Sequence, residues 1–303
     1  MDEIFYWLFN MSIAASIAGI IIALFRLIKR IPRRFFVVLW LIPFLRFWIP
    51  FGIGGKYGLM SLLSRFTTKT VTVLEEIPGN FTMTNYTMAA SSYFPITYKV
   101  DLLSGVFSVA SYVWAVIAAA LIIAMAIVYI TTVSEVKNAE HLHDNVYCSP
   151  KISSPAVYGI FRPRIIVPAS VADSNDLNLI ILHEQRHIRR LDNLFRMIAF
   201  LTAAVHWFNP LVWVFLKLYL TDAEIACDES VLSRLPEEER HHYAHALLNV
   251  RESKTVFVSS FGGARLRTRI ERILSFKRLT FVSAAGFCIL AAAIAYILLT
   301  NAA

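Results

Sequence analysis

The sequence has few cysteines, few charged residues and a deficit of acidic ones. Its three cysteines, Cys148, Cys227 and Cys288, lie far apart in 303 residues and form no CxxC pair, which argues against a disulfide framework. Charged residues make up 17% of the chain and hydrophobic residues 57%, against about 45–50% apolar residues in soluble domains. The chain also has no internal repeat or low-complexity tract. This composition predicts a membrane protein.

The excess of basic residues, 29 lysines and arginines against 21 acidic residues, has two explanations. A basic chain can bind nucleic acid, whereas in a membrane protein basic residues mark the cytoplasmic loops. The strong hydrophobicity favours the second explanation. We therefore expect contact with membrane lipid and no direct contact with nucleic acid.

Four apolar stretches approach or exceed the ~20 residues that an α-helix needs to cross a bilayer. They are Ile4 to Phe25, Phe35 to about Ile53, Val106 to Thr132 and Leu279 to Leu299. The first is not expected to be a cleaved signal peptide, because no basic segment precedes it and no small-residue cleavage pattern follows it. The second is the weakest span, since it contains Pro43 and Arg46. We expect Arg46 to extend towards the membrane interface.

The link from Arg26 to Arg34 carries five basic and no acidic residues, which places it in the cytoplasm. Residues 133–278 then also lie inside, and they hold 19 of the 29 basic residues, so the two signals agree. The predicted organisation is two spans in residues 1–53, an outer loop at 54–105, a span at 106–132, a cytoplasmic domain at 133–278, a span at 279–299 and an outer tail at 300–303. The outer loop contains Asn-x-Thr sequons at Asn80 and Asn85, interpreted here as ordinary polar loop.

The cytoplasmic segment has a mixed pattern, so we expect an α+β domain. Residues 155–161 and 164–168 read as short strands bounded by turn residues. The first of them, at Tyr158 and Gly159, could pair with an extended substrate or could be an ordinary core strand. A helix is expected from Asp173 and Ser174 to Arg190.

An apolar hairpin is expected next, from Leu194 to Leu220 and interrupted at Asn209-Pro210. Each half is too short to span a bilayer, so the hairpin is either buried or re-entrant, and we favour membrane contact. Asn209 as the N-cap and Pro210 at the first helical position would start a helix that runs to about Leu235.

The chemistry is concentrated in the segment His183-Glu-Gln-Arg-His187. On a helix, histidines four residues apart project from one face and can bind one Zn²⁺. Glu184 can then act as general base on the water in the fourth coordination position. The alternative is a solvated basic helix, since Arg186, Arg189 and Arg190 lie close by. We favour the zinc site.

The third zinc ligand should come from another helix, and Glu224 is the best candidate. Glu224 and Asp228 are four residues apart, so one can bind the metal while the other accepts the N–H of a ligand imidazole. Asp192 could orient a ligand in the same way, or could pair with a nearby arginine. An exposed acidic helix face is the alternative interpretation of residues 222–229.

Two further features are better explained by ordinary structural roles than by metal binding. The histidines of His241-His242-x-x-His245 have helical spacing but no internal glutamate, which favours a solvated face. Cys227 lies close to the proposed ligand in sequence, and we expect a small buried residue rather than a thiolate ligand.

These motifs together resemble the BlaR/MecR-type membrane antirepressor metalloproteases of Gram-positive bacteria. The segments that carry the resemblance are Gly159-Ile-Phe-Arg-Pro-Arg-Ile-Ile-Val-Pro168, His183-Glu-Gln-Arg-His-Ile-Arg-Arg-Leu-Asp192, Trp207-Phe-Asn-Pro-Leu-Val-Trp213 and Glu224-Ile-Ala-Cys-Asp-Glu229. The resemblance implies a gluzincin, with zinc on His183, His187 and Glu224 and with Glu184 as base. It also implies signal-triggered cleavage of the protein itself and of a DNA-bound repressor. Ser260-Phe261 resembles the self-cleavage site, with Ser275-Phe276 as the alternative.

The sequence departs from that family at its C-terminus, where only a few residues follow Leu299 in place of a penicillin-binding domain. We therefore expect a truncated form or a relative with another trigger, and no β-lactam binding. A Ste24-like housekeeping protease, a non-catalytic receptor scaffold stiffened by zinc, and a transporter are the other function classes. The clear spans have no ionisable residues of the kind that line ion pathways. A homodimer is an open alternative to a monomer.

Overall fold

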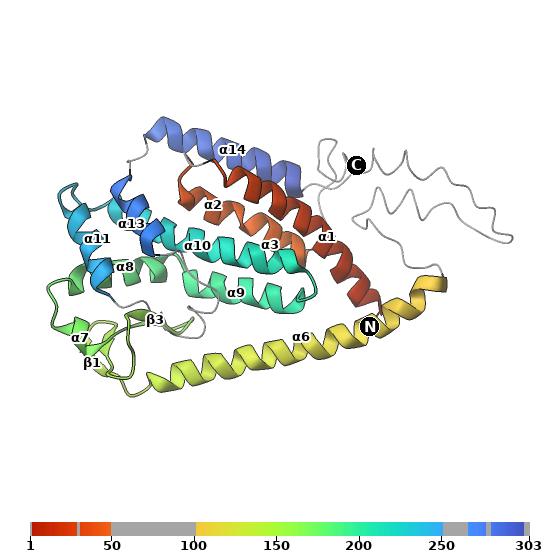
Figure 1. Ribbon diagram of the computed structural model, residues 1–303, viewed down its shortest axis with the longest axis horizontal. Coiled ribbons are helices and arrows are strands. Elements are labelled where there is room, and N and C mark those ends of the chain that lie inside the picture. The colour runs from red at the N-terminus through yellow and green to blue at the C-terminus, as the bar shows by residue number, and fades with distance from the viewer. Residues whose placement is uncertain (1, 29–30, 50–100, 251–265, 277–279, 300–303) are drawn as a thin grey trace.

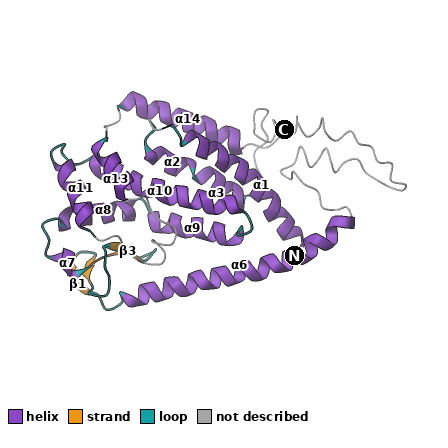
Figure 2. Ribbon diagram, viewed as in Figure 1, coloured by secondary structure: helices purple, strands orange, loops and turns teal. Residues whose placement is uncertain are grey.

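The computed structural model describes residues 2–28, 31–49, 101–250, 266–276 and 280–299. Most of the predicted outer loop, both of its sequons, the dipeptide Ser260-Phe261 and the C-terminal tail lie outside these residues. The molecule is an elongated bundle of helices with a small sheet at one end (Figure 1). Helices dominate the fold, and orange strands gather only at that end (Figure 2).

Three helices of the described residues are long and apolar enough to cross a membrane. They are α1 (Asp2–Phe25), α6 (Asp101–Glu135) and α14 (Phe281–Leu299), and their apolar parts are Ile4–Phe25, Gly105–Glu135 and Val282–Leu299. They coincide with three of the four predicted spans. Most of the apolar side chains of α6 and α14 face outwards, as a lipid environment requires.

The second predicted span differs from expectation, because residues 33–48 form two short helices. These are α2 (Arg33–Leu39) and α3 (Leu41–Trp48), with a turn at Trp40. Pro43 explains the break, since it cannot donate a hydrogen bond to Leu39 and its ring crowds that carbonyl. Arg46 does not extend outwards: it is buried, and its Nε donates to the carbonyl of Leu298 in α14 at 2.8 Å.

The predicted apolar hairpin is present as α9 (Asp192–Val205) and α10 (Pro210–Leu232). Asn209 caps α10, because its Oδ1 accepts the N–H of Leu211 at 2.9 Å and Pro210 occupies the first turn. The Asn209 amide also donates to Ser12 and Ser16 of α1, at 2.8 and 2.7 Å. The helix ends three residues earlier than the expected Leu235.

The Asn209→Ala variant is expected to lower the free energy of unfolding by about 1–2 kcal/mol, because it removes both the helix cap and the bonds to α1. Asn209→Asp keeps the capping oxygen but loses the amide donors, so its loss should be smaller. Thermal unfolding in detergent micelles measures both variants. Equal stability of the alanine variant and the wild type would contradict this role.

Helix α10 forms the centre of the bundle, against α1, α2 and α9. Phe215 and Leu216 of α10 are buried with Trp40 in the largest apolar cluster. Helices α1 and α10 approach closely at Gly19, where a Cβ would lie 2.2 Å from the Phe215 ring. A glycine is therefore needed at this crossing.

Charged side chains also pack inside this bundle, on the side of α10 that faces α1 and α2. Asp222 is fully buried and accepts the Nε–H of Arg26, at 2.9 and 3.0 Å, and the Nε1–H of Trp40, at 2.9 Å. The Glu229 carboxylate accepts the backbone N–H groups of Arg33 and Arg34, at 3.0 and 3.2 Å. These bonds fasten the link between α1 and α2 to α10.

The sheet has four short strands in the order β1-β2-β4-β3. They are β1 (Glu140–His143), β2 (Val146–Cys148), β3 (Ala156–Tyr158) and β4 (Arg164–Val167). Strands β2 and β4 are parallel and the other pairs antiparallel, with Tyr158 opposite Arg164. Gly159 (φ +86°) makes the turn after β3, where a Cβ would lie 3.0 Å from the carbonyl of Arg162.

The sequence predicted β3 and β4, each longer than observed, but not β1 and β2. Strand β1 is fully exposed and lacks the alternating apolar pattern of a half-buried strand. The two unpredicted strands extend the sheet on the side away from β3.

Helix α8 (Leu177–Arg189) lies between the sheet and the helices that follow it in the chain. Ile181 packs against Val146, Ile165 and Val167 of the sheet. On another face, Leu179 and Leu182 pack on a cluster shared by α10, α11 (Glu239–Asn249) and α13 (Leu266–Leu274). A short helix, α7 (Ala169–Ala172), precedes α8.

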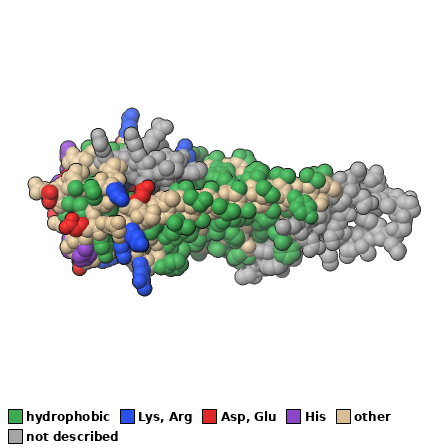
Figure 3. Space-filling view, turned by 90° about the horizontal axis from the view of Figure 1, so that it is seen from below, with side chains coloured by type: hydrophobic (Ala, Val, Ile, Leu, Met, Phe, Trp, Pro, Cys, Tyr) green, Lys and Arg blue, Asp and Glu red, His purple; other side chains and the backbone are tan. Residues whose placement is uncertain are grey.

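The surface divides along the length of the molecule. In Figure 3, hydrophobic side chains cover the body of the bundle, and basic, acidic and histidine side chains gather at one end. That end holds the sheet, α8 and α11 in Figure 1. The arrangement indicates an apolar bundle with a polar domain at one end.

Candidate metal centre

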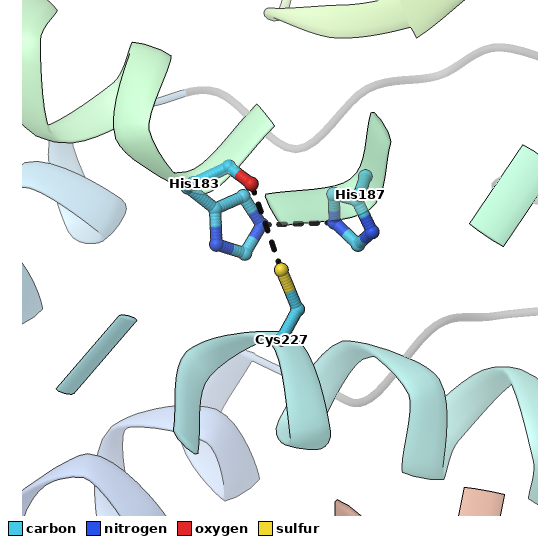
Figure 4. A group of neighbouring side chains, drawn as sticks. All are labelled: His183, His187 and Cys227. Carbon is cyan, nitrogen blue, oxygen red and sulfur yellow. Dashed lines mark hydrogen bonds between the residues drawn. The ribbon is translucent and has the colours of Figure 1, made fainter. Parts of the chain in front are cut away.

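His183 and His187 lie one turn apart on the buried face of α8. Their Nε2 atoms are 3.2 Å apart, close to the ~3.3 Å expected for two ligands of one tetrahedral zinc ion with Zn–N bonds of about 2.0–2.1 Å. Both imidazoles are buried. Figure 4 shows them on one helix, facing Cys227 from the helix opposite. The spacing therefore fits a shared metal ion.

The remaining nitrogen of each imidazole has an oxygen partner. His187 Nδ1 lies 2.6 Å from Oδ2 of the buried Asp192, and Leu191 (φ +56°) makes the turn that brings Asp192 back to α8. His183 Nδ1 lies 2.8 Å from the Tyr243 hydroxyl, which donates to Asp228 at 2.8 Å. With both Nδ1 atoms protonated, the two Nε2 lone pairs face one position; Nη2 of Arg269 in α13 also lies 3.3 Å from Nε2 of His183, and a cation would replace that contact.

The protonation of the pair fits this arrangement. Burial lowers the pKa of His183 well below its usual value. Burial would also lower the pKa of His187, but the charge of Glu224 and the hydrogen bond to Asp192 raise it well above the usual value. Without a metal, a proton on His187 can bridge the two nitrogens, and a divalent cation would replace that proton.

Tyr243 is a residue that the sequence did not predict. It lies on α11 between the exposed histidines of the 241–245 cluster, and it is buried beside His183. Asp228 was expected to accept an imidazole N–H directly. Instead its Oδ1 lies 3.5 Å from His183 Nδ1, with Tyr243 as the bridge.

The third donor has two candidates, both on α10. Glu224 Oε1 lies 3.9 Å from His187 Nε2 and is bonded by Arg196. Cys227 forms a closer group with the two histidines, because all three potential ligand atoms lie within 4.8 Å of one another.

The chemistry of the two donors favours Glu224. Burial raises the pKa of Cys227, and its thiol donates to the carbonyl of His183 at 3.6 Å, which suits a packed thiol. Burial alone would raise the pKa of Glu224, but Arg196 and His187 hold it well below its usual value. Glu224 is therefore an ionised carboxylate at the site.

Glu184 is buried next to His183 on α8. Burial raises its pKa, and the nearby His187 opposes this shift. A carboxylate with a raised pKa is a better proton acceptor, as general-base chemistry requires.

Strand β3 is an edge strand within the described part of the sheet, pairing with β4 only. One carbonyl of β3 and one of the turn after it already have a partner. The Asn193 amide, at the start of α9, donates to the carbonyls of Val157 and Gly159 at 2.9 and 3.1 Å. An extended peptide pairing with β3 would have to displace this amide or pair beside it.

The alternative self-cleavage dipeptide lies just after α13, where Ser275 is exposed and Phe276 is partly buried. The Phe276 ring contacts the apolar cluster shared by α10, α11 and α13. The Cζ atom of the Arg240 guanidinium lies over this ring, 5.4 Å from the ring centroid. Ser275 Oγ donates to the Glu271 carbonyl at 2.8 Å. Cleavage at this position would require the segment to leave its packing.

Comparison with known proteins places the chain in a family. Residues 6–275 match the family described as BlaR1 peptidase M56. The chain is 33% identical over 138 residues to the regulatory protein BlaR1 of Bacillus licheniformis, 43% of this chain and 23% of that protein. It is 30% identical over 122 residues to BlaR1 of Staphylococcus aureus, 38% of this chain and 21% of that protein. It is 28% identical over 109 residues to the methicillin resistance mecR1 protein of Staphylococcus aureus, 35% of this chain and 19% of that protein.

These aligned segments span about a fifth to a quarter of the relatives' length, whereas the family match covers most of this chain. The chain therefore belongs to the BlaR1 peptidase M56 family.

Proposed function

We propose that this protein is a membrane zinc endopeptidase that transmits a signal by cleaving itself, a cytoplasmic repressor, or both. The observation that carries the proposal is the pair of buried imidazoles on α8, with Nε2 atoms 3.2 Å apart and both Nδ1 atoms engaged. The family supports a metallopeptidase. The relatives' names, a regulatory protein and a methicillin resistance protein, support a regulatory role.

In this proposal His183, His187 and Glu224 hold zinc, and Asp192 and Asp228 orient the two imidazoles. When bound, zinc supplies Lewis acidity, polarising the scissile carbonyl and lowering the pKa of a bound water to about 7. Glu184 takes the proton from the attacking water and delivers it to the leaving amine nitrogen. The buried position of Glu184 keeps bulk water from competing for that proton.

The basic link between α1 and α2 and the basic segment around α13 support a cytoplasmic position for the polar end. The N-terminus would then lie outside. The substrate would be the protein's own segment before α14 or a cytoplasmic regulator. Ser260-Phe261, which lies outside the described residues, is the proposed self-cleavage site, and Ser275-Phe276 is the alternative.

Removal of the metal is expected to stop self-cleavage completely and reversibly. A strong chelator should prevent formation of the two fragments on a gel, and added Zn²⁺ should restore it. Circular dichroism should change little, because the apolar core of the bundle lies apart from the metal-site residues. Cleavage that persists in metal-free protein would contradict the proposal.

One observation favours a second function, that of a receptor scaffold with a structural metal. The sulfur of Cys227 lies within 4.8 Å of both ligand nitrogens. With Glu224 it would complete four protein ligands, the closed set typical of structural zinc sites. Such a site would leave no position for a water or a substrate.

A further inference from the structure

Helix α13 contributes an arginine to the candidate metal centre from a segment that the zinc motif does not include. Arg269 lies on this helix, just before the last candidate span, and its side chain is 15% exposed. Ile273 of the same helix is fully buried among Val231, Leu232 and Tyr243. Figure 1 shows α13 beside α10 and α11, so the packing of Ile273 brings Arg269 to the site.

The guanidinium of Arg269 binds Asp228 through two parallel hydrogen bonds. Its Nε lies 2.8 Å from Oδ2, and its Nη2 lies 2.8 Å from Oδ1. This fork geometry is the strong form of a carboxylate–arginine pair. Asp228 Oδ1 also accepts a hydrogen bond from the Tyr243 hydroxyl, so these bonds fix the carboxylate that orients Tyr243, and through Tyr243 the imidazole of His183.

The same guanidinium lies between the buried carboxylate of Asp228 and the partly buried carboxylate of Glu224. Its Nη1 is 3.7 Å from Oε2 of Glu224, and its Nη2 is 3.3 Å from Nε2 of His183. Glu224 and Asp228 are one turn apart on α10, and two like charges at that spacing repel each other. The positive charge of Arg269 lies next to both carboxylates and offsets this repulsion.

We propose that Arg269 is a positioning residue of the metal centre, acting through Asp228 and Tyr243 on His183. This inference rests on the proposed zinc site. The metal centre thus includes α13, the helix that leads to the last candidate span, rather than α8 and α10 alone. Arg269 is not a ligand, because its guanidinium has no lone pair to donate.

At other metal sites, the loss of a residue that orients a ligand weakens metal binding by about 10–100-fold. Arg269→Met should lower zinc affinity by that factor, measured by competition with a chromogenic chelator. Tyr243→Phe should act in the same direction. The double variant should bind zinc no more weakly than Arg269→Met alone, because both residues act on His183 through one path.

The matched control is Arg267→Gln. Arg267 is two residues away on the same helix, and among the described residues it forms only an exposed pair with Glu271, at 2.9 Å. This variant should bind zinc as the wild type does. Arg269→Lys should recover part of the affinity, since an ammonium can neutralise Asp228 but cannot form the fork.

The visible spectrum of the cobalt(II)-substituted protein gives a readout that loss of helix packing alone would not produce. Arg269→Met and Tyr243→Phe should shift its bands in the same way, because both change the orientation of one ligand, whereas Arg267→Gln should leave the bands unchanged. Wild-type affinity and spectrum in Arg269→Met would overturn the proposal, as would additive losses in the double variant. If Arg269→Met does not fold, the cobalt spectra of Arg269→Lys and Tyr243→Phe replace it. Shifted bands then support the proposal, and wild-type bands overturn it. A wild-type chain that binds no zinc would instead overturn the proposed function.

Discussion

Glu184→Gln is expected to lower the rate of peptide cleavage by about 10²–10⁴-fold, because the amide cannot accept a proton from the attacking water. Zinc content should stay at the wild-type level, since the proposed ligands are the two histidines and Glu224. The rate is measured as the appearance of the two self-cleavage fragments on a gel, with mass mapping of the new termini. Zinc is measured on the same samples.

Glu237→Gln is the matched control for this experiment. Its carboxylate is 80% exposed and pairs only with Arg240 among the described side chains, so cleavage should continue at the wild-type rate. Wild-type processing in Glu184→Gln would remove the general base from the mechanism, whereas loss of cleavage with signalling intact would favour the receptor scaffold.

Asp222→Ala is expected to lower the free energy of unfolding by about 3–5 kcal/mol, the range seen when one partner of a buried ion pair is removed. Asp222 is fully buried, and it is the acceptor for Arg26 and Trp40. Its removal leaves the Trp40 N–H and a partly buried guanidinium without this partner. The loss can be followed by tryptophan fluorescence during thermal unfolding in detergent.

Two other substitutions set the scale for this effect. Asp222→Asn keeps an oxygen that can accept from Trp40, so its loss should be smaller. Glu271→Gln removes a partner of an exposed pair, and such pairs contribute about 0–1 kcal/mol. If Asp222→Ala were as stable as Glu271→Gln, the bonds from Asp222 to Arg26 and Trp40 would not stabilise the bundle.

Local patterns predicted the parts of the fold that depend on neighbouring residues. The i, i+4 histidines placed α8 and its buried face, and Asn209-Pro210 placed the start of α10, because a cap and a helix period act within a few residues. Apolar length likewise located α1, α6 and α14. The second span was predicted as one helix because its apolar residues are continuous, although Pro43 divides it.

The rest of the site depends on contacts between distant segments. Tyr243 reaches His183 across 60 residues, and Arg269 reaches Asp228 across 41. Nothing local distinguishes Arg269 from Arg267, which points to solvent from the same helix. The spacing predicted carboxylates near the imidazoles, but the bridging hydroxyl and the neutralising arginine depend on how α11 and α13 pack.

Helix α10 connects the bundle with the candidate metal centre. Asp222 and Glu229 bind the link between α1 and α2, and Glu224 and Asp228 of the same helix lie at the metal position. A displacement of α1 or α2 would therefore act on the carboxylates of the site. The proposed signalling role needs a connection of this kind.

X-ray absorption at the zinc edge of the purified protein tests the central claim most directly. We predict one zinc ion per chain with only nitrogen and oxygen ligands at about 2.0–2.2 Å, including two imidazoles, as expected for a site on His183, His187 and Glu224 with a water in the fourth position. A sulfur ligand at about 2.3 Å would place Cys227 on the metal and indicate a closed structural site. That result, or the absence of bound zinc, would contradict the account.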